Sequence, residues 1–487
     1  MTDTAAVSRS AAQRPGLFTR LAYGVGGAAG GIKNNGFDYV LLLFYSQVLG
    51  LSAVLVAAAM WIALLFDAVS DPVVGYWSDN LRTKWGRRHP LMYVAMAPVA
   101  IAYFFVWNPP SDLTEMGLFS WLLTLTVSVR LMYTLFEVPS TALAAELSQD
   151  YDARTSLMSF RYFFAWVGGL TVQVVLFMFL LKPSEGDPSG FFHLPGWHSY
   201  GLIGASCIFV AVLITSLGTH RHIPHLKAPP SPRKLTPVKV IGEIWETVSN
   251  PSFRALFLAT LFGLLATGVS ATLNQYINGF FWEFSSKQIS GLTAAVYVSS
   301  ILALVLAPLA GRMFGKKKAA IAIGLLAFTI APAPVIARQF GLLPPNGTEA
   351  LYMIVLSVTV VDLALIIAYQ MLAASMVADI VEENELATGR RSEGIYFAGI
   401  SFMRKLAQGV GVLSASFILA AAAITPGMRS AEASEQAVRT LGWGYALTLL
   451  SLWMVMILCI SFYRISREDH ERNLRELASR ETTEPTP

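Results

Sequence analysis

Residues 61–77, WIALLFDAVSDPVVGYW, place two aspartates, Asp67 and Asp71, inside an otherwise apolar run. A carboxylate at the centre of a bilayer-spanning helix costs roughly 2.5–3.5 kcal/mol, so two on one helix need compensation. A spacing of four residues puts both side chains on one helix face, about 6 Å apart between Cβ atoms. Like charges at that separation favour a cation between them. The stretch predicts a Na⁺ or H⁺ site within a membrane. As an alternative, the two carboxylates share a proton or form an ion pair with a neighbouring helix and have a structural role only.

The composition is that of a membrane protein. The chain has 487 residues, of which 54% are hydrophobic and 14% charged, with a mean hydropathy of +0.54. A soluble domain carries about 25% charged residues. The apolar residues form twelve runs between residues 21 and 464, each able to cross roughly 30 Å of hydrocarbon as a helix. The sequence therefore predicts an all-α membrane protein with twelve transmembrane helices, whose partners are the lipid bilayer and a small-molecule substrate.

Basic residues gather in alternate loops, at 82–88, 221–239, 312–318 and 390–391. Such clusters stay in the cytoplasm, so we expect both termini there, in the plasma membrane or the inner membrane of a Gram-negative bacterium. The surplus of basic residues behind the net charge of +4 then serves to orient the chain in the membrane, and we expect no nucleic-acid partner. We also expect the protein to function as a monomer.

The chain is expected to divide into two six-helix halves, since a Pro-, Ser- and Lys-containing stretch separates them. GYWSDNLRTKWGRRHP (75–90) and APLAGRMFGKKKA (307–319) follow the second span of each half, which indicates an internal repeat. Repeated halves are typical of transporters that rock around a central site. The predicted segments are a cytoplasmic tail 1–20, a bundle 21–217, a cytoplasmic central loop 218–252, a bundle 253–464 and a cytoplasmic tail 465–487.

The fourth predicted span carries three further candidates, Tyr133, Thr134 and Glu137. Thr134 and Glu137 are three residues apart and share a helix face. Their hydroxyl and carboxylate groups are expected to complete the cation shell or to bind substrate hydroxyls. For Thr134 the alternative is a hydrogen bond to its own helix backbone.

Basic side chains inside spans need anionic partners. Arg161 and Lys405 lie in the fifth and eleventh spans, and we expect them to compensate the buried carboxylates when the cation is absent, with snorkelling to the interface as the alternative. In the turn after the second span, Asp79 is expected to pair with Arg87 or Arg88. That pair is either a gating latch or a simple orientation signal.

Several polar residues in other spans are candidate substrate contacts: Lys33, Asn34, Asp38, Gln275 and Tyr369. GRMFGKKKA has three residues between its glycines and no Ser or Thr after the lysine, so it is not a phosphate-binding loop. No Ser–His or Cys–His arrangement is evident either. The sequence predicts neither an enzyme nor a cofactor beyond the coupling ion.

Several motifs resemble those of the glycoside–pentoside–hexuronide:cation symporters, which are melibiose-permease-like members of the major facilitator superfamily. The motifs are FDAVSDPVVGYWSDNLRTKWGRRHP (66–90), FYSQVLGLS (44–52), YTLFEVP (133–139) and ADIVEENELATGRRSEGIYFAGISFMRK (378–405). The resemblance covers most of the chain. It implies the twelve-helix major facilitator superfamily fold and cation-coupled symport of a sugar or glycoside by alternating access.

The resemblance also implies roles for individual residues. The family's cation-site carboxylates fall on Asp67 and Asp71 and its cation-site threonine on Thr134. Its eleventh-span lysine falls on Lys405. Its fourth-span sugar-binding aspartate falls on Glu137, and its fifth-span arginine on Arg161.

One position departs from the family pattern. The family's first-span sugar-binding aspartate falls on Gly31, and Asp38 is out of register with it. A lysophospholipid or another amphiphilic organic anion is therefore an alternative substrate. A membrane sensor that does not transport is a third possibility, which the retained Asp67, Asp71 and Lys405 disfavour.

Overall fold

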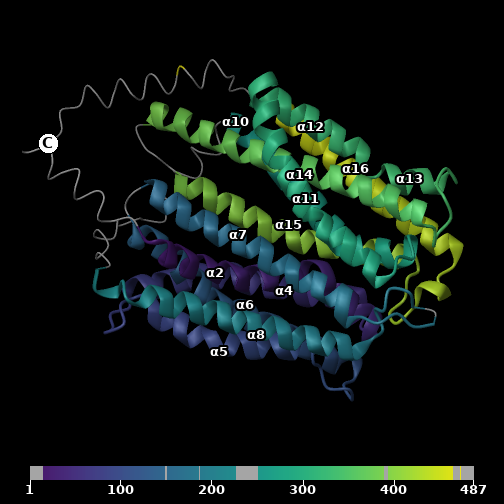
Figure 1. Cartoon of the computed structure of the whole chain (residues 1–487), viewed down its shortest axis with the longest axis horizontal. Helices are drawn as coiled ribbons and strands as arrows, with labels where there is room; N and C mark the ends of the chain where they lie inside the picture. Colours follow the sequence, from purple (N-terminus) through teal and green to yellow (C-terminus); the bar gives the residue numbers. More distant parts are fainter. Residues whose placement is uncertain are drawn as a thin grey trace, which may run out of the picture. The chain divides into compact units, whose positions relative to one another are not determined.

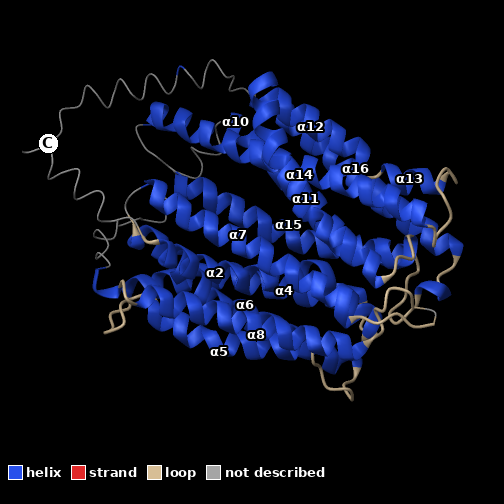
Figure 2. Ribbon diagram, viewed as in Figure 1, coloured by secondary structure: helices blue, strands red, loops and turns tan. Residues whose placement is uncertain are grey.

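The computed structural model describes residues 15–148, 151–185, 187–225, 251–388, 393–463 and 472. Within these ranges every long regular segment is a helix (Figure 2). Ten described helices are long and apolar enough to cross a membrane. The other two predicted spans fall on residues 17–48, where the helix is interrupted, and on α15 (Glu393–Ala421). The predicted all-α membrane fold is confirmed.

The chain forms two compact units. The first comprises Met1–Ser231, Ser285–Thr293 and Ile424–Ala433, and the second comprises the remainder. The last two segments of the first unit lie beyond the predicted boundary at residue 253. Hydrogen bonds hold them there, since Ser290 Oγ lies 3.5 Å from the carbonyl oxygen of Val174 and Gly427 N lies 3.1 Å from that of Ser46. Most of the predicted central loop lies outside the described residues.

The first unit is a bundle in which neighbouring helices run side by side (Figure 1). α2 packs along α7 and α8, α6 packs along α4 and α5, and α5 also packs along α8. π-helical turns continue α2 and α7 towards their C-terminal ends. The elements are α2 (Leu17–Asn35), η1 (Gly36–Val40), α3 (Leu41–Leu43), η2 (Phe44–Val48), α4 (Ala53–Asn80), α5 (His89–Val106), α6 (Glu115–Leu147), α7 (Tyr151–Val175), η3 (Leu176–Leu180), α8 (Leu194–His220) and η4 (Ile223–His225).

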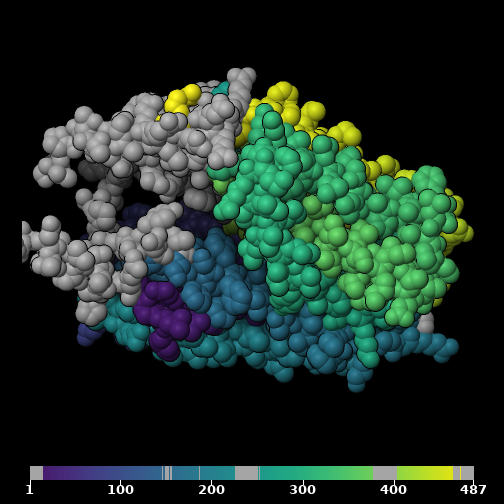
Figure 3. All heavy atoms as spheres, turned by 45° about the horizontal axis from the view of Figure 1, so that its top comes forward, coloured from purple at the N-terminus to yellow at the C-terminus, as the bar shows by residue number. Residues whose placement is uncertain are grey.

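The second unit repeats this pairing. α10 packs along α15 and α16, and α12 packs along α14 and α16, so α10 and α12 stand where α2 and α5 do in the first unit. Figure 3 shows the side chains of these green to yellow helices as a continuous packed mass. The elements are α10 (Pro251–Tyr276), η5 (Ile277–Phe281), α11 (Ser286–Phe314), α12 (Lys316–Ile330), α13 (Ala333–Gln339), α14 (Glu349–Thr388), α15 and α16 (Glu435–Ser461); the 3₁₀ turn η6 (Ser430–Glu432) belongs to the first unit.

Local sequence explains where several helices begin. The hydroxyls of Thr114 and Ser434 accept hydrogen bonds from backbone N–H groups in the first turns of α6 and α16. Such side-chain caps satisfy N–H groups that have no intrahelical partner. Pro90 occupies the first turn of α5, where its missing N–H is tolerated.

Glycines allow the first helix of each unit to approach its partner closely. A Cβ atom on Gly27 or Gly31 of α2 would overlap the backbone of α7. In the second unit, a Cβ on Gly411 of α15 would lie 2.6 Å from the carbonyl carbon of Gly268 on α10. Small residues at such positions let membrane helices pack backbone to backbone.

Candidate functional site

The two aspartates of α4 meet a threonine of α6. Thr134 Oγ1 lies 3.1 Å from Asp67 Oδ1 and 3.1 Å from Asp71 Oδ1. Asp67 and Thr134 are buried, and Asp71 is half-buried. A threonine hydroxyl carries a single proton, so it donates to one carboxylate at a time and keeps oxygen lone pairs for a further partner. Carboxylate and hydroxyl oxygens are the ligands that hard cations take in proteins, so the three predicted residues together can hold a small cation or a proton.

The sequence of α4 fixes this geometry. Asp67 and Asp71 lie one turn apart on the face that packs along α6. Pro72 lies within the helix. Because proline has no N–H, the carbonyl oxygen of Ala68 lacks the intrahelical bond that residue 72 would otherwise donate. The α4 backbone thus offers another oxygen acceptor beside the aspartates.

Arg130 is a member of this cluster that the sequence reasoning missed. Its Nη1 atom lies 3.5 Å from Asp67 Oδ2. Arg130 also interacts electrostatically with Asp38 and Asp71. Its side chain is 3% exposed. The available signal was a charged residue four positions before Thr134 in an apolar span, which places both on one face of α6.

Glu137 and Arg161 lie on α6 and α7 of the same unit. Arg161 Nη1 donates to Ser140 Oγ at 3.1 Å, and Ser140 Oγ lies 3.1 Å from the carbonyl oxygen of Glu137. The Arg161 guanidinium also lies 5.7 Å from the ring centroid of Tyr23, within the range of a cation–π contact. Arg161 is buried whereas Glu137 is exposed, so the structure fixes the arginine and leaves the Glu137 side chain accessible.

The candidate residues of the first span, Lys33, Asn34 and Asp38, have different surroundings. Lys33 Nζ lies 4.3 Å from the centroid of the Tyr133 ring, and both residues are buried. Asn34 is exposed. Asp38 lies in η1 and interacts electrostatically with Arg130. Substrate contact for these residues stays a prediction.

Packing explains the absence of a side chain at Gly31. A Cβ atom there would overlap the carbonyl oxygen of Ala165 on α7. No carboxylate could stand at this position while α2 and α7 keep their spacing. The first-span aspartate that the resemblance implies therefore has no counterpart here, for a steric reason.

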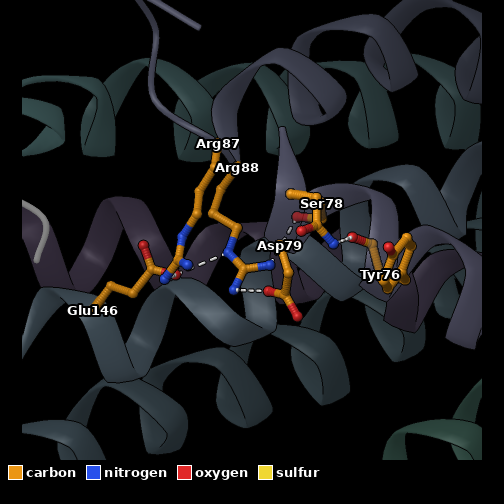
Figure 4. A network of polar contacts seen from close by, with 7 residues as sticks. Tyr76, Ser78, Asp79, Arg87, Arg88 and Glu146 are labelled. Carbon is orange, nitrogen blue, oxygen red and sulfur yellow. Dashed lines mark hydrogen bonds and ion pairs between the residues drawn. The ribbon is translucent and has the colours of Figure 1, made fainter. Parts of the chain in front are cut away.

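The predicted latch residues form an ion-pair network at the turn between α4 and α5 (Figure 4). Arg88 contacts Asp79 Oδ1 at 2.6 Å and donates to Ser78 Oγ at 2.8 Å. Arg87 points instead to Glu146 on α6, at 2.7 Å, a partner that the sequence did not reveal. The expected Asp79–Arg88 pair is present, and its role in gating stays a prediction.

The predicted residues of the second unit lie on three helices. Gln275 on α10 is buried, and neither amide atom has a hydrogen-bond partner among the described residues. Tyr369 on α14 lines a cavity of about 50 Å³ together with Thr260, Thr267 and Gln370. Lys405 is half-buried on α15, and its pairing with the aspartates of α4 stays a prediction. Most of the 378–405 motif lies where side chains are outside the described part of the chain.

Comparison with known proteins covers almost the whole chain. The sequence profile described as "MFS/sugar transport protein" matches residues 22–467. An uncharacterised symporter of Synechocystis is 26% identical, over 95% of this chain and 97% of that protein. The isoprimeverose transporter of Lactiplantibacillus pentosus is 22% identical, over 88% and 84%. The mouse sphingosine-1-phosphate transporter MFSD2B is 26% identical, over 83% of this chain and 81% of that protein.

Solved structures share the fold at lower sequence similarity. The inward-facing structure of a bacterial homologue of the iron transporter ferroportin superposes with a TM-score of 0.62. It covers 92% of this chain and 100% of that one, at 14% identity. This likeness concerns the fold alone.

Proposed function

Because the chain belongs to the MFS/sugar transport protein family, we propose that it carries a sugar or glycoside across the membrane together with Na⁺ or H⁺, by alternating access. It is a multi-pass membrane transporter and not an enzyme. Its relatives include proteins named as symporters and as an isoprimeverose transporter. Isoprimeverose is a glycoside, which supports the proposed substrate class.

The observation that carries the proposal is the cluster of Asp67, Asp71 and Thr134. All three side chains converge within hydrogen-bond distance inside one unit. Cation binding there would raise the affinity for substrate, and substrate would raise the affinity for the cation by the same factor. That reciprocal coupling is the property a symporter requires.

We assign substrate binding to side chains of both units. Those of the first are Lys33, Asn34, Asp38, Tyr133, Glu137 and Arg161, and those of the second are Gln275 and Tyr369. The exposed Glu137 beside the fixed Arg161 supports this assignment, since a carboxylate and a guanidinium offer an acceptor and several donors to substrate hydroxyls. We assign Lys405 to charge compensation, and Asp79, Arg87 and Arg88 to gating. The basic loops support cytoplasmic termini in the plasma membrane, and we propose a monomeric transporter.

An amphiphilic anion is the second candidate substrate. Gly31 lacks the carboxylate that the sugar-binding pattern has at this position, and a relative of similar coverage is named as a sphingosine-1-phosphate transporter. Such a substrate would combine a long hydrocarbon chain with a charged headgroup.

The test is thermal unfolding of the purified protein with a panel of sugars, glycosides and lysolipids, in NaCl and in choline chloride. A ligand that binds the folded state raises its stability by mass action. A sugar that stabilises more strongly in NaCl, or whose uptake follows a proton gradient, supports the proposal. Stabilisation by lysolipids alone would favour the second candidate substrate. Uptake that depends on neither Na⁺ nor a proton gradient would refute symport.

A further inference from the structure

Arg130 adds a positive charge to the cluster formed by Asp67, Asp71 and Thr134. Asp67 and Asp71 carry two negative charges when ionised, and Arg130 contributes one positive charge through its contact with Asp67. Arginine stays protonated in proteins. A fixed positive charge therefore lies against Asp67 before any cation binds.

The contacts on Asp67 show how this charge is held. Thr134 Oγ1 contacts one carboxylate oxygen, Oδ1, and Arg130 Nη1 contacts the other, Oδ2. The Arg130 side chain is 3% exposed, so water screens its charge far less than it would at the surface. Any cation that enters between Asp67 and Asp71 therefore meets the field of the guanidinium.

We propose that Arg130 is a built-in competitor of the transported cation, which neutralises Asp67 in the cation-free protein and sets the affinity of the site. This inference rests on the proposed cation-coupled transport. A cation that binds between Asp67 and Asp71 must displace Arg130 from Asp67 or share the carboxylate with it. The same unit that holds the cation thus supplies the charge that replaces it.

Replacing the competitor should tighten cation binding. In Arg130→Gln, the midpoint concentration of NaCl or LiCl for thermal stabilisation of the purified protein should fall by about tenfold or more, because a positive charge that repels the cation is removed. Arg338→Gln is the matched control, because that arginine belongs to the second unit and bonds there to the carbonyl oxygen of Pro344. An unchanged or higher midpoint in Arg130→Gln would overturn the inference, since a purely structural arginine would lower the unfolding temperature without shifting the midpoint.

A charge-rescue pair covers the case in which Arg130→Gln fails to fold. Asp67→Asn removes the carboxylate that Arg130 contacts and leaves the guanidinium charge near the site, so it should abolish stabilisation by NaCl and LiCl. Asp67→Asn/Arg130→Gln removes both members of the ion pair, so neither charge is left buried without its partner. The double variant should regain stabilisation by at least one of the salts, and a response no better than that of Asp67→Asn would refute the competitor role.

Failure of the inference can be told apart from failure of the proposed function. Suppose that a cation gradient drives substrate uptake by the wild type, that Arg130→Gln does not lower the salt midpoint, and that the double variant responds no better than Asp67→Asn. The proposed transport function then holds, and only the competitor role of Arg130 is refuted. If neither a Na⁺ nor a proton gradient drives uptake of any substrate in the panel, both fall together.

Discussion

Arg88 Nε lies 2.8 Å from Glu146 Oε1, and this contact joins the start of α5 to the C-terminal end of α6. Arg87 Nη2 reaches the same oxygen at 2.7 Å. The side chain of Glu146 is 9% exposed, so two arginines, rather than water, compensate its charge. Removing one partner of a buried ion pair leaves uncompensated charge in a low-dielectric region.

Glu146→Gln should therefore lower the free energy of unfolding by roughly 3–5 kcal/mol, measured by thermal or chemical unfolding in detergent. The control is Glu435→Gln, whose partner Arg439 lies 3.6 Å away on the exposed face of α16. An exposed pair of this kind contributes about 0.3–0.5 kcal/mol. Equal losses in the two variants would show that the Glu146 contacts do not stabilise the α5–α6 junction.

Asp71→Asn should abolish cation-stimulated uptake and leave folded protein in the membrane. Asp71 is half-buried, so its carboxylate is more accessible to an entering cation than that of Asp67, and an amide removes the charge with little change in volume. Uptake in Na⁺ and in choline medium, with surface expression measured in parallel, checks the prediction. Uptake that stays fully cation-stimulated would show that the site lies elsewhere.

Thr134→Val should weaken cation binding by about tenfold, because a hydrogen bond to a charged group contributes roughly 1.5–3 kcal/mol. Valine keeps the shape of threonine and removes the hydroxyl that contacts both aspartates. Thr126→Val is the matched control on the same helix, since its hydroxyl bonds to the carbonyl oxygen of Leu122. Titrations of NaCl and LiCl that give the same midpoint in both variants would contradict a ligand role for Thr134.

The sequence predicts those parts of the site that depend on spacing within one helix. Asp67 and Asp71 share a face because they are four residues apart, and that property belongs to α4 alone. For Thr134 the residue type left a place in the cation shell and a bond to its own helix both open, and the resemblance implied the first. The structure places its hydroxyl at hydrogen-bond distance from both aspartates. The all-helical fold followed from apolar runs of membrane length.

Features that depend on how helices pair were not accessible from the chain alone. The partners of Arg130 and Glu146 lie on α4 and in the turn before α5, more than 50 residues away in the sequence. Gly31 looked like a missing sugar ligand, whereas the structure shows a position that the α7 backbone fills. A local pattern does not specify which neighbouring element a side chain will meet.

Gly31→Ala should destabilise the protein by about 1–3 kcal/mol, the usual effect of overpacking. The added Cβ would overlap the carbonyl oxygen of Ala165, so α2 and α7 would have to separate. Gly75→Ala on α4 is the control, because its Cβ would meet only Val138 Cγ1 at 3.7 Å. That change should leave stability unchanged or raise it by about 0.5–1 kcal/mol. Unfolding temperatures that fall equally would argue against close packing at Gly31.

Tyr369→Phe should separate substrate binding from folding. The Tyr369 hydroxyl is buried without a hydrogen-bond partner among the described residues, beside a cavity of about 50 Å³. Removing a polar group that has no partner leaves stability unchanged or raises it. If that hydroxyl contacts the substrate, the substrate concentration needed for half-maximal thermal stabilisation should rise by about tenfold.

The control for this change is Tyr45→Phe. The Tyr45 hydroxyl donates to the carbonyl oxygen of Val106 at 2.7 Å in a buried setting, so its loss should lower stability by about 1 kcal/mol and leave substrate binding unchanged. The two variants should therefore show opposite patterns, with a binding defect for Tyr369 and a folding defect for Tyr45. A substrate midpoint that is the same in Tyr369→Phe and the wild type would remove Tyr369 from the binding site.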